Sequence, residues 1–303
     1  MEFVAESRAG STSSVGAPCP LCLAASPPWF EKSGRKIARC PSCRTVFVPE
    51  GLARTASGAT IYESENPVFL ADGNDAYYLD DESSLASARE KVEWVRRRVT
   101  EGARLLDVGS GFGHFLQAAT PHFSATGLEL GPAAVERARA RAGVSCTLGS
   151  VYAMPAELGG PFDALTAWDF IEHVPDPMGA LTAMAKAVRP GGYVFLSTPD
   201  AGSAAARALG RHWHYLDPLQ HIVLFGRENL SRALVRAGFE PLAWRSFGHH
   251  YRMRYVFDRL RYLHGQGPLG WGVKLARLLA TPVMDRLVYV RLHDVLGVVA
   301  RRT

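Results

Sequence analysis

Acidic and imidazole side chains are concentrated after one apolar segment of the chain. Residues 162–168 read as a buried strand, and Asp169, Glu172 and His173 follow it closely. In open α/β sheets ligands bind beyond the carboxyl ends of the strands, so these three residues are candidate functional groups. Two carboxylates and an imidazole suit an octahedral Mg²⁺ or Mn²⁺ ion. They also suit a metal-free site in which His173 is a base or orients the loop.

Two more histidines, His214 and His221, lie in the segment 199–225, together with Trp213 and Tyr215. An imidazole can take a proton from a reacting group near neutral pH because its ordinary pKa is about 6.5. Both histidines are therefore candidate bases. For His221 the alternative is a hydrogen bond to the backbone that holds this segment in place.

Two C-x-x-C pairs lie near the N-terminus and contain four of the five cysteines: Cys19, Cys22, Cys40 and Cys43. This spacing predicts a zinc site, because two thiolate hairpins can close a tetrahedral shell of four sulfurs. Such a shell leaves no open ligand position, so the zinc would be structural. The segments 37–40 and 45–48, beside the second pair, are predicted to be strands of a ribbon. Cys146 falls inside a predicted strand and is interpreted as a buried apolar residue.

A glycine-rich turn predicts a different function, the binding of a nucleoside. The apolar run 105–108 reads as a buried strand, and a helix is predicted for 114–119. The glycines between them are Gly109, Gly111 and Gly113. They permit a tight turn and the close approach of a ligand to the backbone. Glu129 ends the next apolar run, about 20 residues after the first glycine, where a carboxylate can reach ribose hydroxyls. The third glycine of a dinucleotide fingerprint would fall at His114, so that fingerprint is not met.

The glycine turn, with Asp107 in the strand before it and Glu129 after it, resembles motif I of the class I S-adenosylmethionine-dependent methyltransferases. The D-x-x-E-H-V-x-x-P segment that begins at Asp169 and the R-P-G-G turn at 189–192 resemble further motifs of this family. The resemblance implies an α/β fold, a Rossmann-like, doubly wound sheet of seven strands in the order 3-2-1-4-5-7-6.

The resemblance also implies S-adenosylmethionine (SAM) as the cofactor. The glycines would cradle it, Asp107 would order the loop and approach the methionine end, and Glu129 would hold the ribose. The family often has an acidic residue at the adenine contact, where this chain has Ser150, so Ser150 or the backbone near Val151 would take that role. The cofactor-binding residues implied in this way are Asp107, Gly109, Gly111, Gly113, Glu129, Ser150, Val151 and Asp169.

The resemblance leaves a divalent metal open. In ubiquinone-biosynthesis O-methyltransferases and small-RNA 2′-O-methyltransferases, the residues equivalent to Asp169, Glu172 and His173 help to bind such a metal. Those enzymes have Glu at the first position, and the same E-H pair occurs in relatives that are not known to use metal. We therefore favour a structural or basic role for these residues over a Mg²⁺ site. The candidate catalytic bases are His221, His173 and His214.

A helix is predicted over 85–99, because apolar residues recur there at helical spacing. Ser83 or Ser84 would cap its N-terminus. Its basic residues are expected on the outer face, away from the sheet.

The chain divides into four predicted parts. Residues 1–17 form a disordered leader, 18–50 the zinc ribbon and 51–84 a linker, and the methyltransferase domain covers 85–303. The aromatic and basic segment 249–290 reads as an insertion before the last strand. Three interpretations of it stay open: a wall of an apolar acceptor pocket, an amphipathic patch on a membrane, or packing as core or as a dimer interface. We favour the last.

The composition is that of a soluble globular protein, with 303 residues, 47% apolar and 21% charged, and a formal net charge of +5. No stretch of 18 uninterrupted apolar residues occurs, and the N-terminus lacks the pattern of a signal peptide, so a cytoplasmic protein is expected. The charge is too small to indicate a nucleic acid partner.

These observations predict methyl transfer from SAM to an O, C or N nucleophile of a small molecule, such as a sugar, a quinone or a lipid-like acceptor. Two alternatives stay open. The first is an RNA methyltransferase, since some of those enzymes also begin with a zinc module, although the ribbon here has no clustered basic stripe. The second is a non-catalytic scaffold that binds the cofactor and whose zinc ribbon binds a partner.

Overall fold

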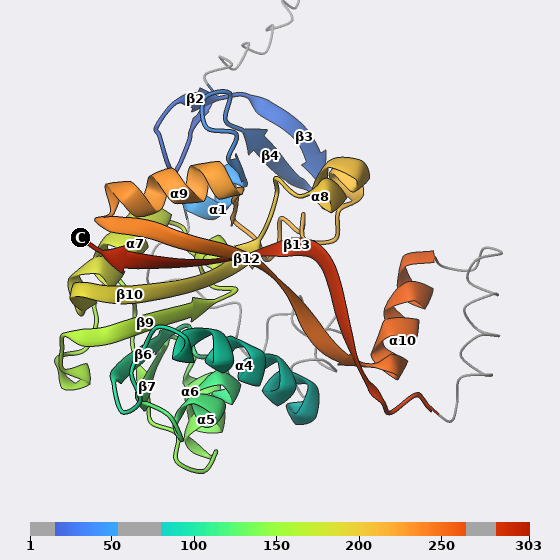
Figure 1. Ribbon diagram of the computed structural model, residues 1–303. Coiled ribbons are helices and arrows are strands. Elements are labelled where there is room, and N and C mark those ends of the chain that lie inside the picture. The colour runs from blue at the N-terminus through green and yellow to red at the C-terminus, as the bar shows by residue number, and fades with distance from the viewer. Residues whose placement is uncertain (1–15, 54–79, 265–282) are drawn as a thin grey trace, which may run out of the picture.

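The computed structural model describes residues 16–53, 80–264 and 283–303, and for residues 260–264 it describes the backbone alone. Within them, a large sheet carries helices on both faces, and a smaller sheet from the N-terminal part lies at the top of the view in Figure 1. Residues 1–15 of the predicted leader and most of the predicted linker lie outside the described residues.

The large sheet has seven strands. Their bounds are β6 Arg104–Val108, β7 Ser124–Glu129, β8 Cys146–Leu148, β9 Phe162–Trp168, β10 Val188–Pro199, β12 Phe239–Arg252 and β13 Leu287–Arg302. They lie in the order β12-β13-β10-β9-β6-β7-β8. Counted along the chain, this is the predicted order 3-2-1-4-5-7-6, read from the opposite edge. β13 is antiparallel to both of its neighbours and the other pairs are parallel, so the predicted doubly wound, Rossmann-like sheet is confirmed.

Helices cover both faces of this sheet, and they explain its apolar central strands. The main helices are α4 Asp81–Arg96, α5 His114–Ala119, α6 Pro132–Arg139, α7 Pro177–Ala187 and α9 Arg227–Arg236. α4 and α5 pack on one face with Phe195 and Phe247. α7 and α9 pack on the other face with Leu165 and Leu196. Strands that are covered on both faces carry mostly apolar side chains, as β6 and β9 do, although β6 also buries Asp107 and β9 also buries Thr166.

The helix predicted over 85–99 begins one turn earlier, and its N-cap is Asp80 instead of Ser83 or Ser84. Asp81 and Glu82 occupy its first turn, where carboxylates are stabilised by the helix dipole. Apolar spacing cannot detect a polar first turn, which is why the predicted start was wrong.

The last two strands extend into the predicted insertion 249–290. β12 continues to Arg252 and β13 begins at Leu287, and these two residues pair with each other. α10 (Met253–His264) follows β12, so this end of the insertion is a two-stranded extension of the sheet with a helix at its tip (Figure 1). Residues 265–282 lie outside the described residues, and the membrane contact and the dimer interface stay predictions. No described helix has the length and apolar character that crossing a membrane requires.

The small sheet joins the N-terminal part to the second half of the chain. Its strands are β3 Pro28–Lys32, β4 Arg35–Arg39, β5 Val46–Phe47 and β11 Val223–Leu224, in the order β11-β5-β4-β3. Beside it are β1 Ala17–Pro18, β2 Ala25–Ser26, α1 Pro49–Leu52 and α8 Ala204–Leu209. Because β11 comes from the chain just after His221, the predicted ribbon and the predicted catalytic segment share backbone hydrogen bonds.

Candidate active site

The three predicted glycines all adopt positive φ, at 71° for Gly109, 51° for Gly111 and 79° for Gly113. A Cβ on Gly109 would lie 2.4 Å from Cδ2 of Phe170, and one on Gly113 would lie 2.9 Å from Cβ of Ala138. A Cβ on Gly111 would meet nothing within 4 Å. Gly109 and Gly113 are therefore needed for the packing of the turn, while Gly111 leaves the backbone open to a ligand.

Glu129 connects the end of β7 to the glycine turn. Its Oε2 accepts a hydrogen bond from the Gly111 N–H at 2.9 Å, and its Oε1 accepts from the N–H groups of Leu130 at 2.8 Å and Gly131 at 2.9 Å. The side chain is buried, and burial raises its pKa although the three N–H groups oppose the shift. The predicted ribose carboxylate thus also fixes the conformation of the turn.

Asp107 lies under the turn at the end of β6. Its Oδ1 accepts a hydrogen bond of 2.6 Å from the hydroxyl of Thr166. Burial, with a smaller contribution from the Glu129 carboxylate, raises the pKa of Asp107 to about 7, against the opposing effects of Thr166 and Lys91. Its position fits the predicted role of ordering the loop.

A cavity of about 430 Å³ opens at the carboxyl ends of β6 and β9. Its walls come from α4, the glycine turn, the segment after β10, and the extension formed by β12, α10 and β13. The predicted site residues that line it are Asp107, Gly109, Gly111, Asp169, Glu172, His173, His214 and His221. Gly113, Glu129, Ser150 and Val151 do not line it. The Ser150 hydroxyl accepts a hydrogen bond from the Tyr152 N–H at 3.2 Å, so the adenine contact stays a prediction.

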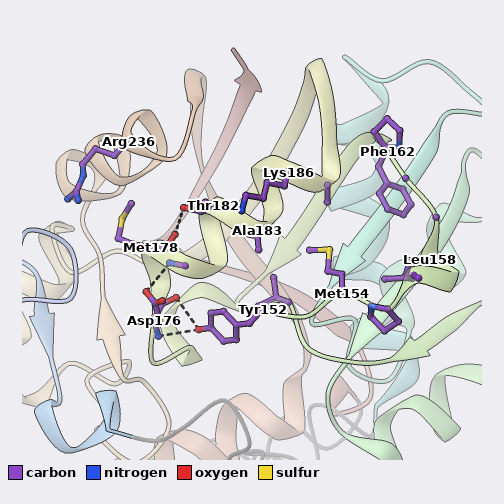
Figure 2. Close-up of a pocket in the computed structure, with 18 residues that line it drawn as sticks. Tyr152, Met154, Leu158, Phe162, Asp176, Met178, Thr182, Ala183, Lys186 and Arg236 are labelled. Carbon is purple, nitrogen blue, oxygen red and sulfur yellow. Dashed lines mark hydrogen bonds between the residues drawn. The ribbon is translucent and has the colours of Figure 1, made fainter.

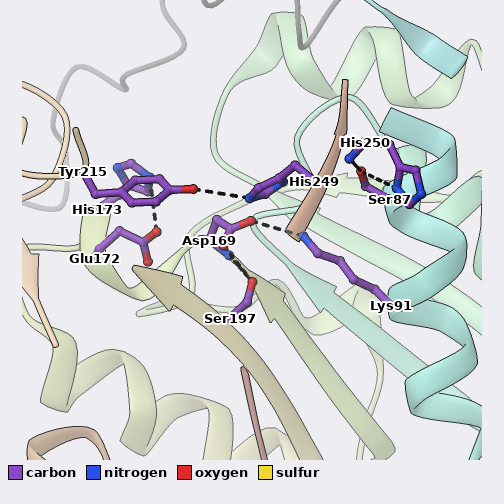
Figure 3. Close-up of polar contacts among 9 residues, drawn as sticks. All are labelled: Ser87, Lys91, Asp169, Glu172, His173, Ser197, Tyr215, His249 and His250. Carbon is purple, nitrogen blue, oxygen red and sulfur yellow. Dashed lines mark hydrogen bonds and ion pairs between the residues drawn. The ribbon is translucent and has the colours of Figure 1, made fainter. Parts of the chain in front are cut away.

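Asp169 is held in an uncommon backbone conformation, with φ at 50°. Its Oδ2 pairs with Nζ of Lys91 at 3.1 Å, and its Oδ1 accepts a hydrogen bond from the Ser197 hydroxyl at 2.8 Å (Figure 3). Burial alone would raise the pKa of Asp169, but Lys91, His249 and Ser197 outweigh it and lower the pKa to about 2. Asp169 is therefore an anion that is already paired with a cation from α4.

Glu172, His173 and His221 bring three acceptor atoms together. The two histidines have Nδ1 at hydrogen-bond distance from backbone carbonyl oxygens, 2.9 Å to Gln220 for His173 and 2.6 Å to Tyr215 for His221. A carbonyl only accepts, so Nδ1 carries the proton and Nε2 keeps a lone pair in each ring. Burial lowers the pKa of His173 to about 3 and that of His221 to about 4.

The carboxylate of Glu172 is fully buried, and neither of its oxygens has a hydrogen-bond partner among the described residues. Burial and the neighbouring Asp169 carboxylate raise the pKa of Glu172 well above its ordinary value. One ligand atom from each of Glu172, His173 and His221 lies within 4.8 Å of the others. The structure thus groups His221 with Glu172 and His173, whereas the sequence analysis placed Asp169 in that position. Three buried acceptor atoms that face one another are unfavourable unless a proton or a cation lies between them.

Sequence reasoning missed two residues of the cavity. Lys91 was expected among the basic residues on the outer face of its helix, but its side chain is mostly buried and its ammonium lies 5.2 Å from the ring centre of Trp168. His249, on the extension of β12, has Nε2 3.4 Å from the Tyr215 hydroxyl, and burial lowers its pKa to about 4 (Figure 3). The sequence analysis placed His249 at the start of the insertion 249–290, whereas the structure places it in β12.

A second hollow, of about 1080 Å³, lies between α7 and the segment that joins β8 to β9 (Figure 2). Its polar groups bond to their neighbours: the Tyr152 hydroxyl donates to the Asp176 carbonyl at 3.0 Å, and Asp176 Oδ1 accepts from the Gly179 N–H at 2.8 Å. The described residues that line it form no buried cluster of carboxylates and imidazoles like the one beside the glycine turn. The smaller cavity therefore carries the candidate chemistry.

The four predicted zinc ligands lie together at the N-terminal end. The Sγ atoms are 3.5 Å apart for Cys19 and Cys43, 3.4 Å for Cys22 and Cys40, and 3.6 Å for Cys22 and Cys43. Sulfurs about 2.3 Å from a zinc ion at tetrahedral angles would be about 3.8 Å apart. Backbone N–H groups of Leu21 and Cys43 also point at the sulfurs of Cys19 and Cys40. This arrangement fits a four-cysteine zinc site.

The glycine turn, the acid at the end of β7 and the sheet order together define the class I SAM-dependent methyltransferase fold. Residues 80–243, more than half of the chain, match the family described as a methyltransferase domain. The chain belongs to this family.

Curated relatives match the same part of the chain. A ubiquinone biosynthesis O-methyltransferase of Xanthomonas campestris is 39% identical over 123 residues, which are 38% of this chain and 51% of the relative. The protein of the same name from Pseudomonas aeruginosa is 37% identical over 115 residues, 36% of this chain and 50% of the relative. The chain thus spans about half the length of these relatives.

Solved structures support the fold. A chain from the complex of the Haloferax volcanii Trm112 methyltransferase activator aligns with a TM-score of 0.54 at 18% identity, over 79% of this chain and 98% of that one. A SAM-dependent methyltransferase from Thermotoga maritima aligns with a TM-score of 0.50 at 17% identity, over 78% and 97%.

Gly109→Ala is expected to weaken the binding of S-adenosylhomocysteine at least about tenfold and to lower stability by about 1–3 kcal/mol. The added Cβ would clash with Phe170 at positive φ. Gly102→Ala is the matched control, because Gly102 has φ of 77° and open space around it, so only the backbone strain would be added. Calorimetric titration and thermal unfolding measure both effects. Equal effects of the two substitutions would contradict the role of packing at Gly109.

Proposed function

We propose that this chain transfers a methyl group from SAM to a hydroxyl group of a small-molecule acceptor. The observation that carries the proposal is the convergence of Glu172, His173 and His221 in the cavity that the glycine turn also lines. Acceptor atoms in that position can take the proton that a hydroxyl loses when it is methylated. The O-methyltransferase relatives support the same chemistry.

The residues present fit the cofactor. Gly111 leaves the backbone uncovered, and Glu129 holds the turn. Its Oε1 accepts two hydrogen bonds, whereas its Oε2 accepts one and retains a lone pair for a ribose hydroxyl. When bound, SAM supplies a methyl group on a positively charged sulfur. The chain contributes alignment of the two reactants, which can lower the barrier by about 7–11 kcal/mol.

The hydroxyl proton has two candidate destinations. In the first, Nε2 of His221 accepts it, and the neutral ring predominates because burial lowers its pKa to about 4. In the second, Glu172, His173 and His221 would hold a divalent cation whose Lewis-acid chemistry would lower the pKa of the acceptor hydroxyl, and the proton would pass to solvent water. The carboxylate of Glu172 is buried and makes no hydrogen bond to the described residues, and its Oε1 faces the Nε2 atom of His173 at 3.9 Å, which favours the cation.

We also propose that Cys19, Cys22, Cys40 and Cys43 hold a structural zinc ion. The sulfur distances support it, as does the closed set of four thiolates. Zinc analysis of the purified chain should then give about one ion per chain, apart from any ion in the cavity.

Calorimetric titration with S-adenosylhomocysteine tests the cofactor, with NAD⁺ and FAD as controls. Paramagnetic resonance of added Mn²⁺, with Glu172→Gln as the matched variant, tests the cation. A transfer assay with methyl-labelled SAM against catechols, quinols and sugars then identifies the acceptor. A chain that ignores S-adenosylhomocysteine and binds a nicotinamide or flavin nucleotide would contradict the proposal.

A further inference from the structure

We propose that the zinc ribbon positions His221, and that Val48 and Asn229 are positioning residues for the reactive cluster of Glu172, His173 and His221. The inference rests on the proposed function, because it concerns the same cluster. It gives the ribbon a role inside this chain, in place of the partner binding considered from the sequence.

The first observation is a set of backbone hydrogen bonds on both sides of Ile222, the residue after His221. The Val48 N–H donates to the Ile222 carbonyl at 2.9 Å, and the Ile222 N–H donates to the Glu172 carbonyl at 2.8 Å. One residue therefore connects the ribbon to Glu172. Because His221 precedes it directly, the position of its ring depends on both bonds.

Strand pairing extends this connection. β5 of the ribbon pairs with β11, with Phe47 opposite Val223 and Val46 opposite Leu224. The Ile222 side chain is buried against Gly51, where an added Cβ would lie 2.8 Å from its Cγ2 atom. The chain after His221 is thus held by pairing and by close packing at the same time.

Asn229 connects the cysteines to the same region. Its side-chain N–H₂ group donates to the Cys43 carbonyl at 3.3 Å and to the Thr45 hydroxyl at 3.1 Å. Its Oδ1 accepts from the Gly226 N–H at 2.9 Å, at the start of α9. Thr45 directly precedes β5, and its hydroxyl lies 3.0 Å from the Cys43 sulfur. The geometry of the second cysteine pair therefore sets where β5, and with it β11, can lie.

The cofactor turn is separate from these contacts. The hydrogen bonds that residues 109–113 make outside the turn run to the carboxyl end of β7, to α5, to Arg141 and to Cys146 of β8. Among the described residues none of them reaches the ribbon. Loss of the ribbon's geometry should therefore disturb the reactive cluster and leave cofactor binding intact.

The test compares three full-length variants with the zinc-loaded protein. Asn229→Asp keeps the acceptor for Gly226 but replaces the donor to Cys43 and Thr45 with an oxygen. Cys22→Ser removes the most exposed of the proposed zinc ligands. Glu228→Gln is the matched control on the same helix, since its side chain is exposed and pairs only with Arg232 among the described residues.

Three readouts separate positioning from general stability. Amide hydrogen exchange is followed in residues 217–225 and, as reference, in residues 105–113. The Cε1–H resonance of His221, assigned with His221→Gln, reports the environment of the ring. Titration with S-adenosylhomocysteine reports the cofactor site.

In Asn229→Asp and Cys22→Ser, exchange in 217–225 is expected to rise at least about tenfold with little change in 105–113. The first variant breaks a buried donor–acceptor pair, and the second removes a proposed zinc ligand from the same ribbon. The His221 resonance should shift, and S-adenosylhomocysteine affinity should stay unchanged. Unchanged exchange in 217–225, or an equal rise in 105–113, would overturn the inference. Failure of the parent protein to bind S-adenosylhomocysteine would instead reject the proposed function, while the exchange comparison would still decide the positioning.

Discussion

Replacing His221 with glutamine is expected to lower kcat for methyl transfer by about 10²–10⁴-fold while S-adenosylhomocysteine affinity stays within about twofold. The imidazole contributes the lone pair at Nε2 to the reactive cluster, and glutamine lacks a group that can accept a proton. The cofactor turn makes no hydrogen bond to His221, so the affinity for S-adenosylhomocysteine should not change. Rates with labelled SAM and the acceptor found in the transfer assay measure the effect.

The pH dependence gives an independent check of His221. Burial lowers its pKa to about 4, so the neutral ring should persist well below the ordinary value near 6.5. Activity should therefore be lost only as the pH falls through about 4. His122→Gln is the control, since His122 lies at the other end of the sheet beside Glu101. An unchanged kcat in His221→Gln would remove His221 from the reaction.

Glu129→Ala is expected to weaken S-adenosylhomocysteine binding at least about 100-fold and to destabilise the free protein by about 2–4 kcal/mol. The substitution removes two kinds of contact at once. The N–H groups of Gly111, Leu130 and Gly131 lose their common acceptor, and the ribose loses its proposed carboxylate. Calorimetric titration and urea unfolding measure the two losses separately.

Glu129→Gln separates these contributions. The amide oxygen can still accept from Leu130 and Gly131, but the amide nitrogen would face the Gly111 N–H, which is also a donor. Stability should then fall less than in the alanine variant, while cofactor binding stays strongly impaired. Full affinity in Glu129→Ala would show that the carboxylate holds neither the turn nor the ribose.

The sequence predicted the central strands and the glycine turn well, because their signals are local. β9 and α5 have the predicted bounds, since an apolar run between turn residues determines a buried strand without long-range information. The strand order came from the family resemblance and is confirmed. The φ values of Gly109, Gly111 and Gly113 agree with the reason for which these glycines were singled out.

The remaining features depend on pairing between distant segments. The extension of β12 exists because Arg252 pairs with Leu287, and no local window contains both residues. Likewise, His221 reaches Glu172 through the backbone of Ile222 and the ribbon strand β5. Lys91 lies on α4, and its side chain turns inward to pair with Asp169, which follows β9 much later in the chain. Sequence spacing could identify these groups as candidates but could not decide which of them meet.

The extension of β12 and β13 offers a way to change which acceptors fit. Side chains alternate between faces along a strand, so deleting two residues from each strand keeps their register and shortens the arm by about 7 Å. His249 and Tyr251 lie on this arm and line the cavity, whereas the glycine turn follows β6, outside the arm, and is expected to keep its position. Under the proposed function, the length of this arm would set the size of acceptor that fits, without a change to the cofactor turn.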